Sequence, residues 1–232
     1  MELIGIIGAM EEEVLSLKDK MEITEVRSIA SLDFFVGSLR NKKVVVVQGG
    51  IGKVNAAICT QILIDVFYVD AIINTGVAGA LDPILEIGDV VISSDAVQHD
   101  FDASGFGYEK GQIPRMTVKS FKSDEHLIKI AKKASDVLSS SVNVYVERIV
   151  SGDQFIAQPA RKAELISEFK GFCTEMEGAA IAHVCYLNKI PCVIIRSISD
   201  KADDSAEVNF AEFTKMAALN SCKMIMRSLE LL

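Results

Sequence analysis

Three carboxylic acids and an arginine lie beside two apolar segments that have the character of neighbouring strands. Glu175 and Glu177 follow a short apolar segment, Arg196 ends a second one, and Ser199 and Asp200 come soon after it. A helical pattern separates the segments, and a strand–helix–strand crossover brings the carboxyl ends of both strands to one edge of a sheet. Open α/β sheets bind ligands at that edge, where carboxyl groups can transfer protons or balance positive charge. The sequence therefore predicts a functional site formed by these residues.

The elements that must position this group are a helix and a buried strand. Residues 177–187 have apolar side chains on one helical face, and Asn188 followed by Pro191 marks the end of the helix. Residues 192–195 are continuously apolar, which is typical of a strand buried on both faces of a parallel sheet.

The order of strand, turn and helix recurs along the chain. Strand patterns cover residues 3–7, 32–39, 43–47, 71–74, 87–97 and 142–150, and helical patterns cover residues 56–66, 123–138, 159–169 and 205–232. Glycine-rich or acidic clusters follow strands at residues 8–13, 49–53, 75–79, 152–156, 175–177 and 199–200. We therefore expect an α/β fold, a three-layer α/β/α sandwich around a mixed, mostly parallel central sheet, with all six clusters at one edge. No repeat or linker interrupts the pattern, which predicts a single domain over residues 1–232.

The amino-acid composition limits the classes of binding partner and the cellular compartment that we expect for this protein. The chain has 232 residues, of which 50% are hydrophobic, enough for a large core. Its net charge of −8 disfavours nucleic acids and anionic membranes as partners. No apolar segment approaches the length of a membrane span, and the first one has no basic leader. The five cysteines are odd in number and form no C-x-x-C pair, so we expect reduced thiols in a cytoplasmic protein.

A long irregular segment at residues 99–114 carries Phe101, Phe106 and Tyr108 between glycines. Long loops of this kind inside a compact domain are usually functional, and aromatic residues are enriched at protein interfaces. His99 has no second histidine at ligand spacing, so we expect no metal site there.

Seven short motifs, among them Gly-Ile-Ile-Gly-Ala-Met-Glu-Glu-Glu-Val at residues 5–14, resemble those of one family in order and spacing. The others lie at residues 50–54, 73–76, 106–108, 151–153, 175–177 and 198–200. Together they make the chain similar to the 5′-methylthioadenosine/S-adenosylhomocysteine nucleosidases, whose superfamily includes the purine nucleoside phosphorylases. The resemblance implies a homodimer that cleaves the N-glycosidic bond of 5′-substituted adenosines with water, without a metal or other cofactor.

The resemblance also implies a role for each matched residue. Glu13 would activate the attacking water, Asp200 would protonate adenine, and Glu177 would bind the ribose and stabilise the oxocarbenium-like transition state. Ser199 would lie beside Asp200. At the ribose, Met176 would lie against the sugar, and an Arg196–Glu175 ion pair would support the site. At the adenine, Phe155 would stack on the ring and the backbone of Ile156 would contact its edge. The 5′ group would be lined by Met10, Ile51, Phe210 and the partner subunit's Phe106. Val77 stands where this resemblance leads us to expect a serine. This difference affects the expected binding of the substrate but not the expected reaction.

The same residue types also have structural interpretations. Glu175 and Glu177 could cap their helix, and Asp200 could cap the next element. Phe155, Met10 and Phe210 could be ordinary core residues, since apolar side chains usually are.

Two other functions compete with the nucleosidase. A purine nucleoside phosphorylase would use phosphate in place of water, but the acidic turn at residues 9–13 would repel phosphate. A non-catalytic protein that binds adenosine analogues would have no use for carboxylates on both sides of a glycosidic bond. The sequence does not rank methylthioadenosine, adenosylhomocysteine, 5′-deoxyadenosine and futalosine-type nucleosides as substrates.

Overall fold

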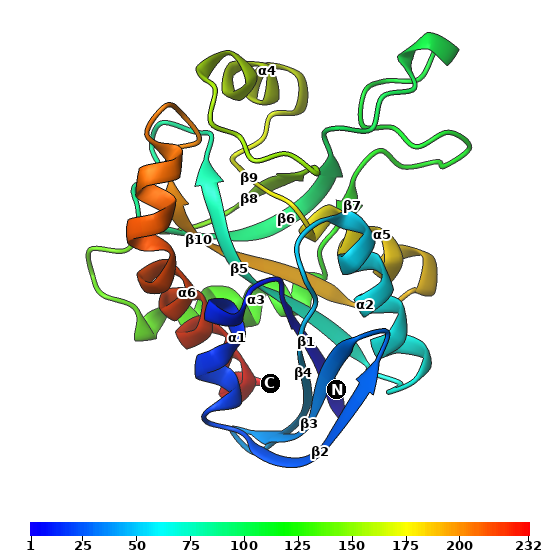
Figure 1. The fold of residues 1–232 in the computed structure, drawn as a ribbon, viewed down its shortest axis with the longest axis vertical. Coiled ribbons are helices and arrows are strands. Elements are labelled where there is room, and N and C mark those ends of the chain that lie inside the picture. Colours follow the sequence, from blue (N-terminus) through cyan, green and yellow to red (C-terminus); the bar gives the residue numbers. More distant parts are fainter.

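The computed structural model describes all of residues 1–232 and shows one mixed sheet with helices on both faces (Figure 1). The strands are β1 (Leu3–Gly8), β2 (Glu22–Ile29), β3 (Leu32–Leu39), β4 (Lys42–Gln48), β5 (Ala71–Ala80), β6 (Val90–Gln98), β7 (Phe121–Lys122), β8 (Val144–Ser151), β9 (Cys173–Glu175) and β10 (Cys192–Asp200). The helices are α1 (Glu11–Lys18), α2 (Lys53–Asp65), α3 (Glu125–Lys133), α4 (Pro159–Phe169), α5 (Gly178–Asn188) and α6 (Ala206–Leu231), with 3₁₀ turns at Ser104–Phe106 and Ala134–Val137.

The sheet closes on itself at one end. Its strand order is β10-β6-β8-β9-β5-β1-β4-β3-β2, and β10 also pairs with β5. Strands β5, β10, β6, β8 and β9 therefore form a closed ring, from which β1, β4, β3 and β2 extend as an open sheet. The α/β fold class with a mixed central sheet is confirmed, and the ring is a feature that the strand pattern alone did not indicate.

Two large hydrophobic clusters hold the layers together. The larger one contains 26 buried residues and packs α2 and α5 against one face of the sheet, through side chains such as Leu63 and Ile181. The second contains 21 buried residues and packs α1, α3 and α6 against the other face, through side chains such as Leu17 and Ile225. Figure 1 shows α1 and α6 on the opposite side of β5 and β1 from α2 and α5. None of the helices has the length and apolar character needed to cross a bilayer.

Strands β5 and β10 are longer than the sequence pattern indicated. The clusters at residues 75–79 and 199–200 were expected to follow their strands, but they form the last residues of β5 and β10. Polar and glycine residues remain in a strand here because the strand ends line a cavity, where a side chain meets a ligand or another side chain instead of the core. The sequence pattern ended both strands early because it counted only apolar residues.

Three other elements differ from expectation. Strand β7 was not predicted, because its two residues are too few to form an apolar pattern. Strand β2 was not predicted, because it lies at the edge of the sheet and almost all of its residues are exposed. The helix expected over residues 123–138 ends at Lys133 and continues as a 3₁₀ turn.

Candidate active site

A cavity of about 340 Å³ opens where the carboxyl ends of β1, β5, β9 and β10 converge. Each of the six clusters singled out in the sequence contributes to its wall. Of the residues proposed for the site, the lining includes Met10, Glu13, Ile51, Val77, Phe155, Ile156, Glu175, Met176, Glu177, Ser199, Asp200 and Phe210. The cavity also reaches Ala9, Ala78, Gly79, Gln154 and Thr174, which the sequence analysis did not name.

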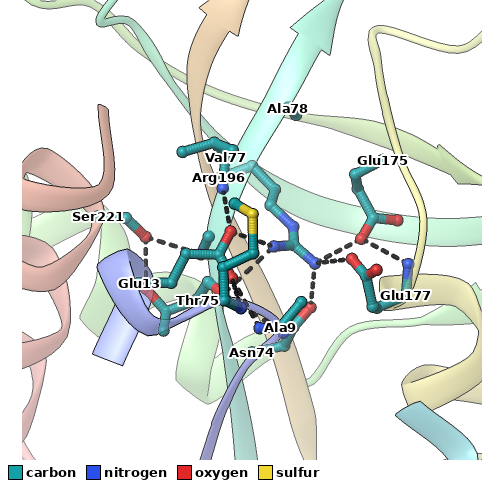
Figure 2. A network of polar contacts seen from close by, with 12 residues as sticks. Ala9, Glu13, Asn74, Thr75, Val77, Ala78, Glu175, Glu177, Arg196 and Ser221 are labelled. Atoms are coloured by element: carbon teal, nitrogen blue, oxygen red, sulfur yellow. Dashed lines mark hydrogen bonds and ion pairs between the residues drawn. The ribbon is translucent and has the colours of Figure 1, made fainter. Parts of the chain in front are cut away.

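Arg196 lies fully buried beneath the cavity and is shared by three carboxyl groups. Its Nη2 donates to Glu175 Oε2 and lies 3.5 Å from Glu177 Oε2, and its Nη1 is 3.7 Å from Glu13 Oε1 (Figure 2). The same guanidinium donates to Asn74 Oδ1 at 2.7 Å and to the Thr75 carbonyl at 3.2 Å. One positive charge among three carboxyl groups favours a protonated form for at least one of them.

Glu13 is placed by the first turn of α1 and by β5. Its Oε2 accepts hydrogen bonds from the amides of Ala9 (2.6 Å) and Met10 (3.0 Å), and its Oε1 accepts one from the amide of Val77 (3.0 Å). Burial raises the pKa of Glu13, although Arg196 and these three amides oppose the shift. A carboxylate has about four lone-pair positions, so three amides leave one free on Oε1.

Glu175 and Glu177 accept hydrogen bonds from the backbone amides of different elements. Glu175 Oε2 accepts from the amides of Glu177 (3.0 Å) and Gly178 (2.8 Å), so Glu175 caps α5 as well as pairing with Arg196. Glu177 accepts instead from the amide of Gly52 at 2.8 Å, on a separate element. Burial and then the charge of Glu175 raise the pKa of Glu177 to about 7.

Asp200 ends β10 on another part of the wall. Its Oδ2 accepts from the Ser199 hydroxyl at 2.9 Å, and its Oδ1 accepts from the amide of Ala202 at 2.9 Å. Burial raises the pKa of Asp200 in spite of these two donors. It therefore fits a group that carries a proton at a higher pH than an ordinary aspartic acid.

The rest of the wall is largely apolar. The rings of Phe155 and Phe210 meet edge to face with centroids 5.6 Å apart, and Phe155 is 46% exposed. Val77 packs with Met10 and Phe210 against α6, so its side chain belongs to the apolar wall. An exposed aromatic ring at the mouth of a cavity is suited to stack on a flat ligand.

Phe106 is the one proposed site residue that lies away from the cavity, apart from the underlying Arg196. It belongs to the 3₁₀ turn Ser104–Phe106, and its side chain is 87% exposed. The segment that carries it extends away from the body of the molecule in Figure 1.

Several polar residues that support the site were not predicted. Asn74 bridges β1 and Arg196, since its Nδ2 donates to the Ile7 carbonyl at 2.9 Å. Ser221 of α6 shares a 2.6 Å hydrogen bond with Thr75 and accepts from the amide of Gly76 at 3.2 Å (Figure 2). The one available signal was the presence of Asn74 and Thr75 at the end of an apolar strand; nothing in the sequence pointed to Ser221.

Known proteins resemble the chain over its whole length. The sequence profile described as the Phosphorylase superfamily matches residues 3–230. The 5′-methylthioadenosine/S-adenosylhomocysteine nucleosidase of Staphylococcus carnosus is 46% identical over 229 residues, which are 98% of this chain and 99% of that protein. The solved structure of the nucleosidase of the same name from Neisseria meningitidis, in complex with methylthio-immucillin-A, has a TM-score of 0.96 and 41% identity over 100% of both chains. That of Colwellia psychrerythraea, in complex with adenine, has a TM-score of 0.95 and 41% identity, covering 98% of this chain and 94% of that one. The protein therefore belongs to the Phosphorylase superfamily and, within it, to the 5′-methylthioadenosine/S-adenosylhomocysteine nucleosidases.

Proposed function

We propose that the protein hydrolyses the N-glycosidic bond of 5′-methylthioadenosine and S-adenosylhomocysteine, and also that of 5′-deoxyadenosine, releasing adenine and the 5′-substituted ribose. The observation that carries this proposal is the meeting of Glu13, Glu177 and Asp200 in one cavity from three different elements. The pKa of each of these carboxyl groups is raised, first of all by burial. Buried carboxyl groups with raised pKa values are suited to general acid–base catalysis, in which one group donates a proton and another accepts one.

Asp200 is proposed as the acid that protonates the leaving base. Adenine is a poor leaving group as an anion, so a proton must reach its ring nitrogen as the C–N bond breaks. Because burial raises the pKa of Asp200, its carboxyl group holds a proton at a higher pH than an ordinary aspartic acid, and the Ser199 hydroxyl fixes the orientation of that group. Phe155 stacks on the adenine ring and the backbone of Ile156 contacts its edge in this proposal.

Glu13 is proposed as the base that activates water. Its free lone pair on Oε1 accepts a proton from the water, whose oxygen bonds to C1′ of the ribose. The protons balance, since water gives one to Glu13, Asp200 gives one to adenine, and the hydroxyl stays on the ribose.

Glu177 is proposed to bind the ribose hydroxyls and to stabilise the positive charge that develops on the sugar. Met176 lies against the ribose, and Arg196 with Glu175 holds Glu177 in place. The apolar wall formed by Met10, Ile51, Val77 and Phe210 suits a 5′-alkylthio group.

Turnover with and without phosphate tests this proposal. Chromatography after incubation with methylthioadenosine should show free adenine and methylthioribose at a rate that does not depend on phosphate. Glu13 lies where phosphate would have to approach, and its charge together with that of Glu177 opposes an anion there. A phosphorylated sugar would instead support a phosphorylase, and a tight complex without turnover would support a binding protein.

We also propose that the chain acts as a single nucleosidase domain over residues 1–232 and as a homodimer in the cytoplasm. All ten strands join one sheet, and all five cysteines are unpaired and buried, in keeping with a reducing compartment. Exposed apolar side chains lie on α2 (Val54, Ile58) and on the neighbouring α5 (Tyr186, Leu187), beside the exposed Ile51. Such a surface supports an interface, to which the partner's loop would add Phe106.

A further inference from the structure

Helix α2 begins without a capping side chain of its own. Its N-cap position is Gly52, which has φ of +95° and no side chain to accept from the first amides of the helix. The acceptor comes instead from Asp153, 100 residues away, whose Oδ1 accepts from the amide of Lys53 at 2.8 Å. The amide of the adjacent Gly52 donates instead to Glu177 Oε1 at 2.8 Å. Two consecutive amides therefore bind two carboxylates on different elements.

Asp153 is itself held by a closed ring of contacts. The Lys53 side chain donates to Asp100 Oδ1 at 2.6 Å, and Asp100 Oδ2 accepts from the amide of Asp153 at 2.9 Å. Lys53 therefore binds both aspartates, Asp153 through its backbone amide and Asp100 through its side chain. The side chains of Lys53 and Asp100 are 18% and 14% exposed, so water screens this contact less than an ordinary surface ion pair. We refer to Lys53, Asp100 and Asp153 as the clamp.

The clamp joins two walls of the cavity. Asp153 directly precedes Gln154, Phe155 and Ile156, which line the side assigned to the nucleobase, while Gly52 holds the carboxylate assigned to the ribose. A side chain at position 52 would lie 3.0 Å from Asp153 Oδ1, which shows how closely the two segments approach.

We propose that Asp153 is a positioning residue that, through the clamp, holds the amide of Gly52 against Glu177. The inference rests on the proposed function, because it concerns the same ribose site. Asp153 touches no reacting atom in this scheme. It acts by keeping Glu177 ionised and oriented, since a hydrogen bond to a carboxylate favours its charged form.

The pH dependence follows from the groups around Glu177. It faces Glu175 from β9, Arg196 from β10 and Glu13 from α1, and of these only Arg196 and the amide of Gly52 favour its ionised form. The hydrogen bond from the amide of Gly52 lowers the pKa of Glu177, so this pKa rises further when the amide moves away. Activity that needs the carboxylate is then lost at a higher pH than in the wild type.

The test compares Asp153→Ala with Asp153→Asn. The asparagine keeps an oxygen that accepts from Lys53 but removes the charge, whereas alanine removes both. We expect Asp153→Ala to lower kcat/KM for methylthioadenosine about tenfold at pH 6.5, with the acid limb of the pH profile moved to higher pH. Asp153→Asn should stay close to the wild type in both measurements.

Asp124→Ala provides a matched control. Asp124 caps α3 by accepting from the amide of Leu127 at 2.9 Å, and neither residue lines the cavity. Both alanine variants should lower the melting temperature by about 2–4 °C, as expected for a lost cap, but only Asp153→Ala should move the pH profile. An unmoved profile in Asp153→Ala, or an equal shift in Asp124→Ala, would overturn the role of Asp153. A wild-type protein that releases no adenine would overturn the proposed function itself.

Discussion

Glu13 and Asp200 are both buried carboxyl groups, but their hydrogen-bond partners differ. Glu13 accepts from three backbone amides, whereas Asp200 accepts from one amide and one hydroxyl. Backbone amides can only donate, so they favour an ionised Glu13. The Ser199 hydroxyl can also accept a hydrogen bond, so it tolerates either protonation state of Asp200. This difference is what we expect if Glu13 accepts a proton and Asp200 donates one.

The division of labour between these two residues can be measured with two leaving groups. Asp200→Asn should abolish adenine release but spare a 5′-methylthioriboside of nitrophenolate, which leaves without a proton. Glu13→Gln should lower the rate with both substrates by about 10² to 10⁴, the usual worth of a general base. Steady-state assays of both variants, with circular dichroism to confirm folding, provide the measurement. Equal loss of both activities in a folded Asp200→Asn protein would contradict its role as the acid.

At the scale of the element, β5 matters because Gly76, which has no side chain, lies directly beside Arg196 and Glu13. A methyl group on Gly76 would overlap Nη1 of Arg196 and would lie 2.5 Å from Glu13 Oε1. Strand β5 can therefore pass beside β10 with a buried guanidinium between them only if residue 76 is glycine. In the strand sequence Asn-Thr-Gly, the Asn74 side chain and the Thr75 carbonyl accept hydrogen bonds from Arg196, and Gly76 leaves the space that the guanidinium occupies.

Gly76→Ala should displace Arg196 from its carboxylates. Because a disrupted buried ion pair leaves uncompensated charge, we expect the free energy of unfolding to fall by about 3 kcal/mol, with loss of adenine release. Denaturant unfolding and steady-state assays test this prediction. Gly5→Ala in β1 is the comparison, since its methyl group would approach closely only the flexible ends of Ile72 and Leu63 and would make an ordinary contact with Val69. That variant should lose some stability but keep kcat/KM, and equal effects of the two substitutions would argue against a special role for Gly76.

The elements show which parts of the site could be predicted from sequence. The carboxylates near β9 and β10 could be predicted because the end of a strand lies at the ligand-binding edge, and the apolar patterns located those ends to within a few residues. The support under them could not be predicted, because Asn74 meets Arg196 of β10, and Ser221 of α6 meets Thr75, only after the strands and layers have packed. The amide of Gly52 is also invisible in sequence, since every residue except proline has an amide and only the fold directs it to Glu177. Strand β2 lacks a buried face, so its residues carry no apolar alternation.

At the scale of the whole molecule, Phe106 has no partner within its own chain. A phenylalanine that is 87% exposed at the tip of an extending loop adds nothing to the core. In the proposed homodimer it closes the 5′ side of the partner's cavity, so assembly and substrate binding depend on each other. Phe106→Ala should therefore raise KM for methylthioadenosine more than KM for adenosine, which has no apolar 5′ group to bury. Tyr68→Ala removes another aromatic side chain, one that is 78% exposed, and should leave both KM values unchanged.

Mixed dimers show whether the aromatic ring acts across the interface. When Phe106→Ala subunits are mixed with Glu13→Gln subunits, a site with an intact Glu13 receives its ring from the Glu13→Gln chain. That site should regain a near-normal KM for methylthioadenosine, measured after subunit exchange has been confirmed by mass spectrometry. If exchange occurs but KM is not restored, the ring acts within its own chain or has no part in binding.

The closed ring of strands also sets the order in which the protein can mature on the ribosome. Strand β5 is complete at Ala80, but along one side it pairs with β10, beginning at Ile72 with Cys192. Until β10 emerges, β5 and β6 each present an unpaired edge of apolar strand, the kind of surface that joins nascent chains into aggregates. Arg196 and Asp200 arrive on the same strand that closes the ring. The last strand to be synthesised therefore closes both exposed edges and brings Arg196 and Asp200 to the cavity, so a chain that ends before β10 lacks both residues and keeps these edges unpaired.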